Sequence, residues 1–147
     1  MNEDTHYCEN QQLPMWITLP LMALLIFMFA LGGINIGSLI CAAILLLIGF
    51  LFGGLNTRLT SDSLDLTFGI GLIKKSISLT NIESFERVKN KWWYGLGIRL
   101  TPHGWMWNMK GLNAIELTYT TGKKFRIGTT NPEGLLAALG IQNSSSN

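Results

Sequence analysis

Few residues of this chain have the types and spacing that catalysis requires. His6 and Cys8 are close in sequence, but two ligands without further partners make a poor metal site. Glu83 and Glu86 come nearest to a pair of catalytic carboxylates, yet with basic residues beside them they are typical of a solvated strand edge. The sequence therefore predicts that the protein is not an enzyme and has no cofactor, metal or small-molecule substrate.

A second kind of chemistry, binding through aromatic and basic side chains, is suggested by residues 90–111. This segment, NKWWYGLGIRLTPHGWMWNMKG, contains four of the five tryptophans, with basic residues among or beside them. Such a segment could be the core of a β-hairpin or a patch that contacts a membrane surface or a partner. The candidate contact residues, which include two lysines of an earlier strand, are Lys74, Lys75, Lys89, Lys91, Trp93, Arg99, Trp105 and Trp107.

Alternation along this segment favours packing over a patch. If residues 92–101 form one strand, and neither Gly95 nor Gly97 inserts a bulge, Trp92 and Tyr94 face the core and Trp93 faces outward. After a turn at residues 101–104, Trp105 and Trp107 share a face. We therefore expect two or three of the four tryptophans to be packed in a hairpin, with the outward remainder free to rest on an anionic membrane leaflet.

The elements that must position these residues begin with a block that contains no charge between Glu9 and Arg58. Segments 13–31 and 36–55 are each nearly twenty residues of almost unbroken apolar character, and a helix of that length spans roughly 30 Å. The sequence predicts a transmembrane helical hairpin over residues 13–55. A signal peptide is the competing interpretation of the first segment, but acidic residues precede it and a second apolar segment follows at once.

The orientation of this hairpin follows from the basic residues. All eleven Lys and Arg residues lie at or after Arg58, so the positive-inside tendency predicts that both termini are cytoplasmic and that the protein is a multi-pass protein of the inner (plasma) membrane. Gly49 and Gly53 form a GxxxG pair, which is a candidate face for packing against the first helix or a second protomer. Alternatively, Gly53 and Gly54 only loosen the end of the helix.

Three further regions complete the predicted organisation. Residues 1–12 are expected to be an acidic flexible tail, residues 56–141 a β domain and residues 142–147 a disordered tail. The β domain is predicted from apolar residues at every second position, with glycine turns in FGIGLIKK (68–75) and TTGK (120–123). One helix closes it, because Asn131 fits the N-cap, Pro132 the first helical position and Gly140 the C-terminal stop.

The segments FGIGLIKKSISLTNIESFERV, WWYGLGIRLTPHGW and AIELTYTTGKKFRIGTTNPEGLLAAL, in this order, resemble the pleckstrin-homology-like fold. The whole arrangement is similar to bacterial membrane-anchored PH-like proteins, in which a transmembrane pair precedes one such domain. The resemblance implies about seven antiparallel strands in a sandwich or partly open barrel with one C-terminal capping helix. The phosphoinositide site of PH relatives is not carried over, because Lys74 and Lys75 are not followed by an arginine.

The function expected from these features is that of a membrane-anchored scaffold whose PH-like domain binds a protein partner or a second copy of itself. The alternative is a weak anionic-lipid or envelope-sensing module that uses the aromatic and basic residues. A third possibility is that the tail, with charge −3, folds back on the region from residue 56 onward, where eleven basic minus six acidic residues give +5. This charge is too small and too dispersed to predict nucleic-acid binding.

Overall fold

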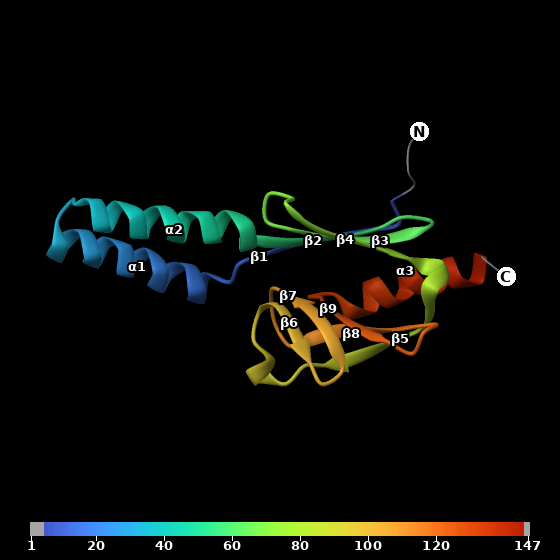
Figure 1. Cartoon of the computed structure of the whole chain (residues 1–147). Helices are drawn as coiled ribbons and strands as arrows, with labels where there is room; N and C mark the ends of the chain where they lie inside the picture. The colour runs from blue at the N-terminus through green and yellow to red at the C-terminus, as the bar shows by residue number, and fades with distance from the viewer. Residues whose placement is uncertain (1–4, 146–147) are drawn as a thin grey trace.

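The chain folds into a helical hairpin that projects from a β-rich body (Figure 1). The structure is a computed structural model that describes residues 5–145, including the side chains of residues 5–140. The hairpin consists of α1 (Met15–Gly32) and α2 (Ile36–Phe52). The Asn35 side chain accepts a hydrogen bond from the backbone N–H of Ser38 at 3.0 Å and so caps α2 at the turn.

The two helices differ in how well they meet the requirements of a membrane span. Helix α1 has 18 residues and is long and apolar enough to cross a bilayer, and none of its residues is buried in the structure. Helix α2 is also apolar but has 17 residues. The finding of an apolar helix near the N-terminus agrees with the sequence, whereas a second span remains a prediction.

The N-terminal residues before the hairpin form a strand, β1 (Tyr7–Gln12), which pairs in antiparallel fashion with β2 (Gly54–Leu59). Only Leu13 and Pro14 separate β1 from α1, and only Gly53 separates α2 from β2. The expectation of a flexible tail is therefore wrong for residues 7–12. Most residues of β1 are polar, so the strand is held by its backbone pairing and by side-chain hydrogen bonds rather than by an apolar pattern that the sequence could reveal. Residues 1–4 of the predicted tail lie outside the described part of the chain.

Sheet A has four strands in the order β1-β2-β3-β4, and the two last are β3 (Ser63–Phe68) and β4 (Ile73–Ser78). Sheet B has five strands in the order β5-β8-β9-β7-β6. Its strands are β5 (Ile82–Lys89), β6 (Gly97–Thr101), β7 (Gly104–Asn108), β8 (Asn113–Tyr119) and β9 (Lys124–Gly128). Two 3-10 turns, η1 (Leu79–Asn81) and η2 (Trp92–Tyr94), complete the body.

The strand count and pairing differ from the expectation of about seven antiparallel strands. The described residues form nine strands, and β7 pairs with β9 in parallel. The extra strands have two sources. Strand β1 is recruited from the N-terminal segment, and the segment after β5 crosses sheet B before β6 begins, which places β7 beside β9 with the same direction. A β-rich body with two sheets and a C-terminal helix agrees with the predicted fold class.

The core lies between the two sheets and is closed at one end by α3 (Pro132–Ser145). Leu135 and Leu139 of α3 are buried in it. The Asn131 side chain accepts a hydrogen bond from the Gly134 N–H at 3.0 Å, so the predicted N-cap is confirmed. Gly140 does not end the helix, because it has no positive φ angle and the helix continues to Ser145. The prediction of a disordered tail is thus wrong for residues 142–145, and residues 146–147 lie outside the described range.

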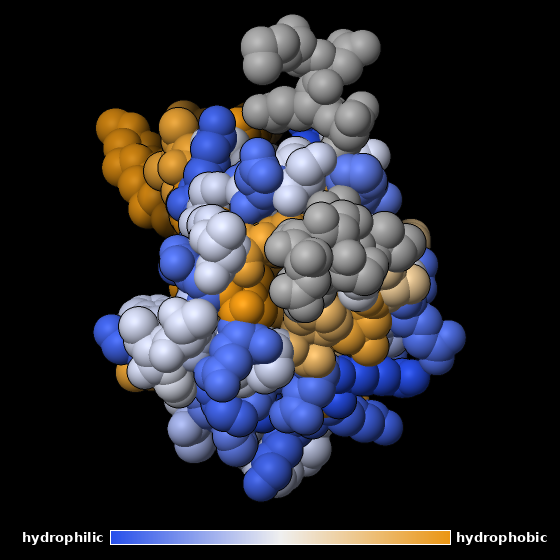
Figure 2. All heavy atoms as spheres, turned by 90° about the vertical axis from the view of Figure 1, so that its right-hand side faces the viewer, coloured by the Kyte–Doolittle hydropathy of each residue, from blue (hydrophilic) through white to orange (hydrophobic). Residues whose placement is uncertain are grey.

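The molecule has two ends of opposite character. The apolar helices form one end, and the opposite end, seen in Figure 2, is mostly hydrophilic around an apolar strip. Among the large hydrophobic residues that are exposed, most belong to α1 and α2. The remainder lie in a few turns and in strands β6 and β7, and these define the candidate surfaces.

Candidate interaction surfaces

The tryptophan-rich segment begins with a crossing from one edge of sheet B to the other. Strands β5 and β6 lie at opposite edges of this sheet, so residues 90–96 must pass from one edge to the other. The crossing is tied down where the backbone N–H of Asn90 donates to the Leu112 carbonyl at 2.7 Å and where the Asn108 side-chain amide donates to the Gly95 carbonyl at 3.3 Å. The expectation of one strand over residues 92–101 is therefore wrong, because Trp92–Tyr94 form η2 and the strand begins at Gly97.

The four tryptophans of this segment consequently differ in their exposure to solvent. Trp107 is 7% exposed and packs its ring against Phe68 and Phe125, with ring centroids 5.3 and 6.1 Å away. Trp92, Trp93 and Trp105 are 76%, 58% and 53% exposed. The expectation that two or three are packed is wrong, since Trp107 alone of the four is buried. Trp93 is exposed, as the sequence predicts.

The basic candidates do not gather into one patch. Lys91 places its Nζ 5.1 Å from the centre of the Trp93 ring, an exposed cation–π contact. Arg99 donates from Nε to the Leu96 carbonyl at 3.1 Å, next to the start of β6. Lys74 and Lys75 belong to the other sheet, and Lys75 lies 5.1 Å from the centre of the Phe125 ring. Lys89, the last residue of β5, is exposed where the crossing begins.

Trp105 has a partner that the sequence did not single out. It lies opposite Leu100 in the register of β6 and β7, and Leu100 is 70% exposed. These neighbouring side chains form an exposed apolar pair on β6, which is an edge strand of sheet B. The alternation Ile98, Leu100 predicts inward-facing residues, but the edge of the sheet has no neighbour that covers Leu100.

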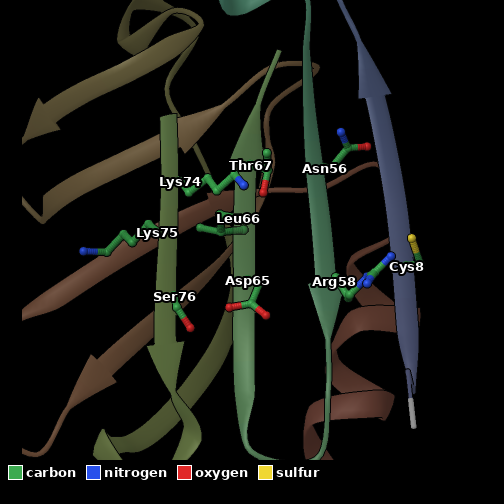
Figure 3. A pocket seen from close by; sticks show the side chains of 9 residues that line it. All are labelled: Cys8, Asn56, Arg58, Asp65, Leu66, Thr67, Lys74, Lys75 and Ser76. Carbon is green, nitrogen blue, oxygen red and sulfur yellow. The ribbon is translucent and has the colours of Figure 1, made fainter. Parts of the chain in front are cut away.

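The outer face of sheet A carries a polar hollow of about 600 Å³ (Figure 3). Its rows follow the strand register, in which Arg58 lies between Cys8 and Asp65, and Thr67 lies opposite Lys74. In Figure 3 the Arg58 side chain reaches toward the strand that carries Cys8, whereas Lys75 points away from the hollow. The residues that line it are Cys8, Asn56, Arg58, Asp65, Leu66, Thr67, Lys74, Lys75 and Ser76.

A buried ionic network lies on the outer face of sheet B. Arg126 donates from Nε to Glu116 at 2.6 Å, and Lys124 contacts the other carboxylate oxygen at 2.5 Å. The guanidinium of Arg126 also donates to the side-chain carbonyl of Asn90, at the start of the crossing, at 3.3 Å. Burial would raise the pKa of Glu116, but the hydrogen bonds and charges of Lys124 and Arg126 outweigh it and hold this pKa below its ordinary value.

This network is structural, and the sequence did not predict it. Glu116 and Arg126 alternate with apolar residues, which indicates a solvent-facing side, yet the side chains are 2% and 8% exposed. Part of the reason is the crossing segment, whose Asn90 side chain contacts Arg126. A long-range crossing of this kind leaves no periodic signal in the sequence.

Glu9 anchors β1 to the loop between β9 and α3. Its carboxylate accepts hydrogen bonds from the hydroxyls of Thr129 and Thr130, both at 2.6 Å, and from the Thr130 N–H at 2.7 Å. The Tyr7 hydroxyl donates to the same carboxylate at 2.8 Å. Partial burial would raise the pKa of Glu9, but these hydrogen bonds lower it below its usual value. Glu9 therefore contacts hydroxyl and amide donors ahead of α3, and not the basic side chains to which a folded-back tail would bind.

The junction between hairpin and body is built from backbone contacts. The Ile70 N–H donates to the Phe50 carbonyl at 3.2 Å, and the Gly69 N–H donates to the Gly54 carbonyl at 2.8 Å. On the other side of the junction a cavity of about 390 Å³ is lined by Leu13 and Phe52 together with residues 96–99 and Met109. The end of α2 thus contacts the β3–β4 turn and shares a cavity with the start of β6.

Gly49 and Gly53 have different surroundings. Gly49 lines a groove of about 290 Å³ between the helices, together with Thr18, Leu21 and Met22 of α1, and a Cβ added to it would meet no atom within 4 Å. Gly53 joins α2 to β2. Their role in self-association remains a prediction.

Among the residues that the structure describes, no three His, Cys, Asp or Glu side chains lie close enough together to hold a metal ion. No family model, curated protein or solved structure matches the chain. The functional argument therefore rests on the surfaces described above.

Proposed function

We propose that this protein is a membrane-anchored scaffold that presents its β body, a PH-like domain, to a protein partner at the cytoplasmic face of the inner membrane. In this proposal α1 and α2 both span the bilayer. Helix α2 has 17 residues and is about 25 Å long at 1.5 Å per residue, which is a few ångströms less than the hydrocarbon thickness and can be accommodated by local thinning of the bilayer. No catalytic step is part of the proposed function.

The observation that carries this proposal is the direct continuation of two hydrogen-bonded strands into the two helices. Because β1 and β2 pair along their whole length and lead into α1 and α2 after two residues and one residue, the sheet cannot swing freely about the hairpin. A flexible tether would serve if the domain only had to be kept near a membrane. A fixed attachment is suited to holding a binding surface at a constant height and direction.

The surface best suited to a protein partner is the exposed pair Leu100–Trp105. Apolar side chains of this size are favoured at protein interfaces, and tryptophan in particular supplies much of the binding energy there. Because β6 is an edge strand, an extended segment of the partner could pair with it and bury both side chains. A second copy of this chain is one such partner.

Photo-cross-linking in native membranes tests this proposal. A photoreactive amino acid at Leu100 should give a cross-linked protein band, and Trp105→Ser should weaken that band without releasing the protein from the membrane. The matched control is the same amino acid at Ser84, which is exposed on β5 at the opposite edge of sheet B. Equal bands from both positions, or none from Leu100, would count against the proposal.

Two further outcomes concern the anchor and the partner. The protein should remain in the membrane pellet after alkaline carbonate extraction, since a peripheral protein is released by that treatment. Cross-linking between two differently tagged copies identifies self-association, whereas a band that contains only one tagged copy identifies a different protein partner. Release by carbonate would exclude the membrane spans.

A further inference from the structure

The β3–β4 turn is fixed at the level of the end of α2. The hydrogen bond from the Ile70 N–H to the Phe50 carbonyl satisfies one of the acceptors that a helix C-terminus leaves open. Gly69 makes this contact possible, because its φ of +52° is unfavourable for other residues and a Cβ there would collide with the carbonyl oxygens of Phe50 and Leu51. The turn therefore lies where the last turn of α2 ends.

This turn carries large apolar side chains outward. Ile70 is 64% and Leu72 is 72% exposed. Leaving such side chains in water forgoes the stabilisation that their burial would contribute. A water-exposed turn is normally polar, so these residues indicate a different surrounding.

A second group of apolar side chains lies on the other side of the junction. Residues 96–99 share a cavity with Leu13 and Phe52, so the end of the β5–β6 crossing is next to the hairpin. Trp92 and Trp93 precede this point in η2, with their rings edge to face and 5.7 Å apart. Figure 1 shows that η2 and the β3–β4 turn both project toward the helical end of the body.

We propose that these two turns form a second membrane contact, beside the hairpin, in which Ile70, Leu72, Trp92 and Trp93 enter the boundary between lipid headgroups and acyl chains. We call these four residues the apolar rim. Indole rings favour that depth, and Lys91, which contacts the Trp93 ring, can extend its ammonium group to the headgroups. This inference rests on the proposed membrane anchoring and adds a lipid-binding surface to it.

The apolar character of the rim distinguishes it from an electrostatic contact. All four of its side chains are uncharged, and the basic residues of the chain are dispersed over several elements. Binding by hydrophobic insertion is insensitive to salt, whereas binding through lysines weakens as salt screens the anionic lipids. The rim is therefore expected to contact zwitterionic and anionic membranes alike.

The experiment uses the full chain in phosphatidylcholine vesicles, with Cys8→Ser and Cys41→Ala removing the native thiols. Single cysteines are introduced by Ile70→Cys, Trp93→Cys or the control Asp62→Cys and labelled with an environment-sensitive fluorophore. Asp62 is exposed in the β2–β3 turn, at the end of sheet A opposite the β3–β4 turn. Nitroxide attached to shallow acyl positions of the lipid should quench the label at positions 70 and 93 several-fold more than at position 62.

A fourth label, at Leu21→Cys in α1, separates this inference from the proposed anchoring. Quenching at position 21 by deep nitroxides with none at positions 70 and 93 would overturn the rim and leave the anchor intact. Absence of quenching at position 21 would overturn the anchor itself. Quenching at positions 70 and 93 that occurs only with anionic lipid and disappears at high salt would also overturn the rim, because it would identify an electrostatic contact.

Discussion

The backbone N–H of Ile70 donates a hydrogen bond to the carbonyl oxygen of Phe50, 3.2 Å away, and so joins a turn of sheet A to the end of α2. A second bond, from Gly69 to Gly54, fixes the same turn to the residue at which β2 begins. The helix, the strand that follows it and the turn that lies beside both are therefore one unit. Any movement of α2 would have to be transmitted to the body through this junction.

Gly69→Ala should be strongly destabilising. The substitution forces a residue with a side chain to adopt a positive φ, which alone costs about 1–2 kcal/mol, and the new Cβ collides with two backbone carbonyls. We expect a loss of more than about 2 kcal/mol in the free energy of unfolding, measured by chemical denaturation of the full chain in detergent micelles and followed by circular dichroism.

Gly122→Ala is the matched control for this substitution. Gly122 has a similar positive φ of 77°, but a Cβ added there would meet no atom within 4 Å. It should therefore show the conformational cost of about 1–2 kcal/mol without the collision. Equal losses for both variants would mean that Gly69 does not approach α2 closely.

Glu9→Gln should destabilise the attachment of β1. The carboxylate accepts hydrogen bonds from Thr129, Thr130 and Tyr7, and bonds to a charged group contribute about 1.5–3 kcal/mol each when buried. Since Glu9 is only half-buried, we expect a total loss of about 1–2 kcal/mol, because solvent weakens such bonds. Amide exchange should increase in β1 and at Thr129 and Thr130 before it increases in sheet B, which is the measurement that locates the effect. Unchanged exchange in β1 would contradict this role.

The same carboxylate predicts how stability depends on pH. The pKa of Glu9 and that of Glu116 are lowered in the folded protein, so both groups contribute stability above the unfolded glutamate pKa of about 4.3. This contribution is lost as pH falls from that value through the lowered folded pKa. At the alkaline end, burial and the hydrogen bond to Glu9 raise the pKa of Tyr7 to about 12, so its contribution is lost as pH rises from about 10 to 12.

Thermal unfolding of the full chain in micelles between pH 3 and pH 7 measures the loss of stability at acidic pH. The midpoint should fall below pH 4.3, and Glu9→Gln should reduce that fall while it lowers the midpoint at pH 7. A variant whose midpoint declines with acid as steeply as that of the parent chain would show that Glu9 is not one of the groups responsible.

The parts of the fold that were predicted from sequence are those encoded by local patterns. The charge-free helices, the glycine turns at 69–71 and 122, and the Asn131 cap all depend on residues within a few positions of one another. The missed parts depend on contacts between distant residues. Strand β1 has a polar sequence and exists through its pairing with residues beyond the hairpin, which no local period reveals.

The candidate surfaces, too, divide into features that local patterns predict and features that depend on contacts between distant residues. Exposure of Trp93 was predicted from alternation, but the exposure of Trp92 follows from the crossing of sheet B, which replaces a strand by η2. Ile70 and Leu72 were not recognised as surface residues because their neighbours form an ordinary glycine turn. Only the position of that turn beside α2 gives them a possible function.

Arg126→Met should be among the most destabilising substitutions in sheet B. It leaves the buried carboxylate of Glu116 with Lys124 as its remaining basic partner, and breaking a buried ion pair costs about 3–5 kcal/mol. Glu116→Leu combined with Arg126→Met removes both charges and should recover much of that loss. The two variants are compared by chemical denaturation of the full chain in micelles. A double variant as unstable as Arg126→Met would show that packing, and not the unpaired charge, determines the cost.

The tryptophans provide the sharpest test of the fold, because the exposure expected from the sequence differs from their exposure in the structure. Alternation predicts that Trp92 is a core residue and leaves Trp107 among the candidate surface contacts, whereas Trp92 is 76% and Trp107 is 7% exposed. Trp107→Ala should therefore lower the free energy of unfolding by about 3–5 kcal/mol, since it empties the space between Phe68 and Phe125.

Trp92→Ala should change the free energy of unfolding by less than about 0.5 kcal/mol in detergent, because its side chain packs mainly against Trp93 in a surface turn. Circular dichroism follows both transitions without relying on tryptophan fluorescence. Similar large losses for the two variants would support a single strand over residues 92–101 in place of η2.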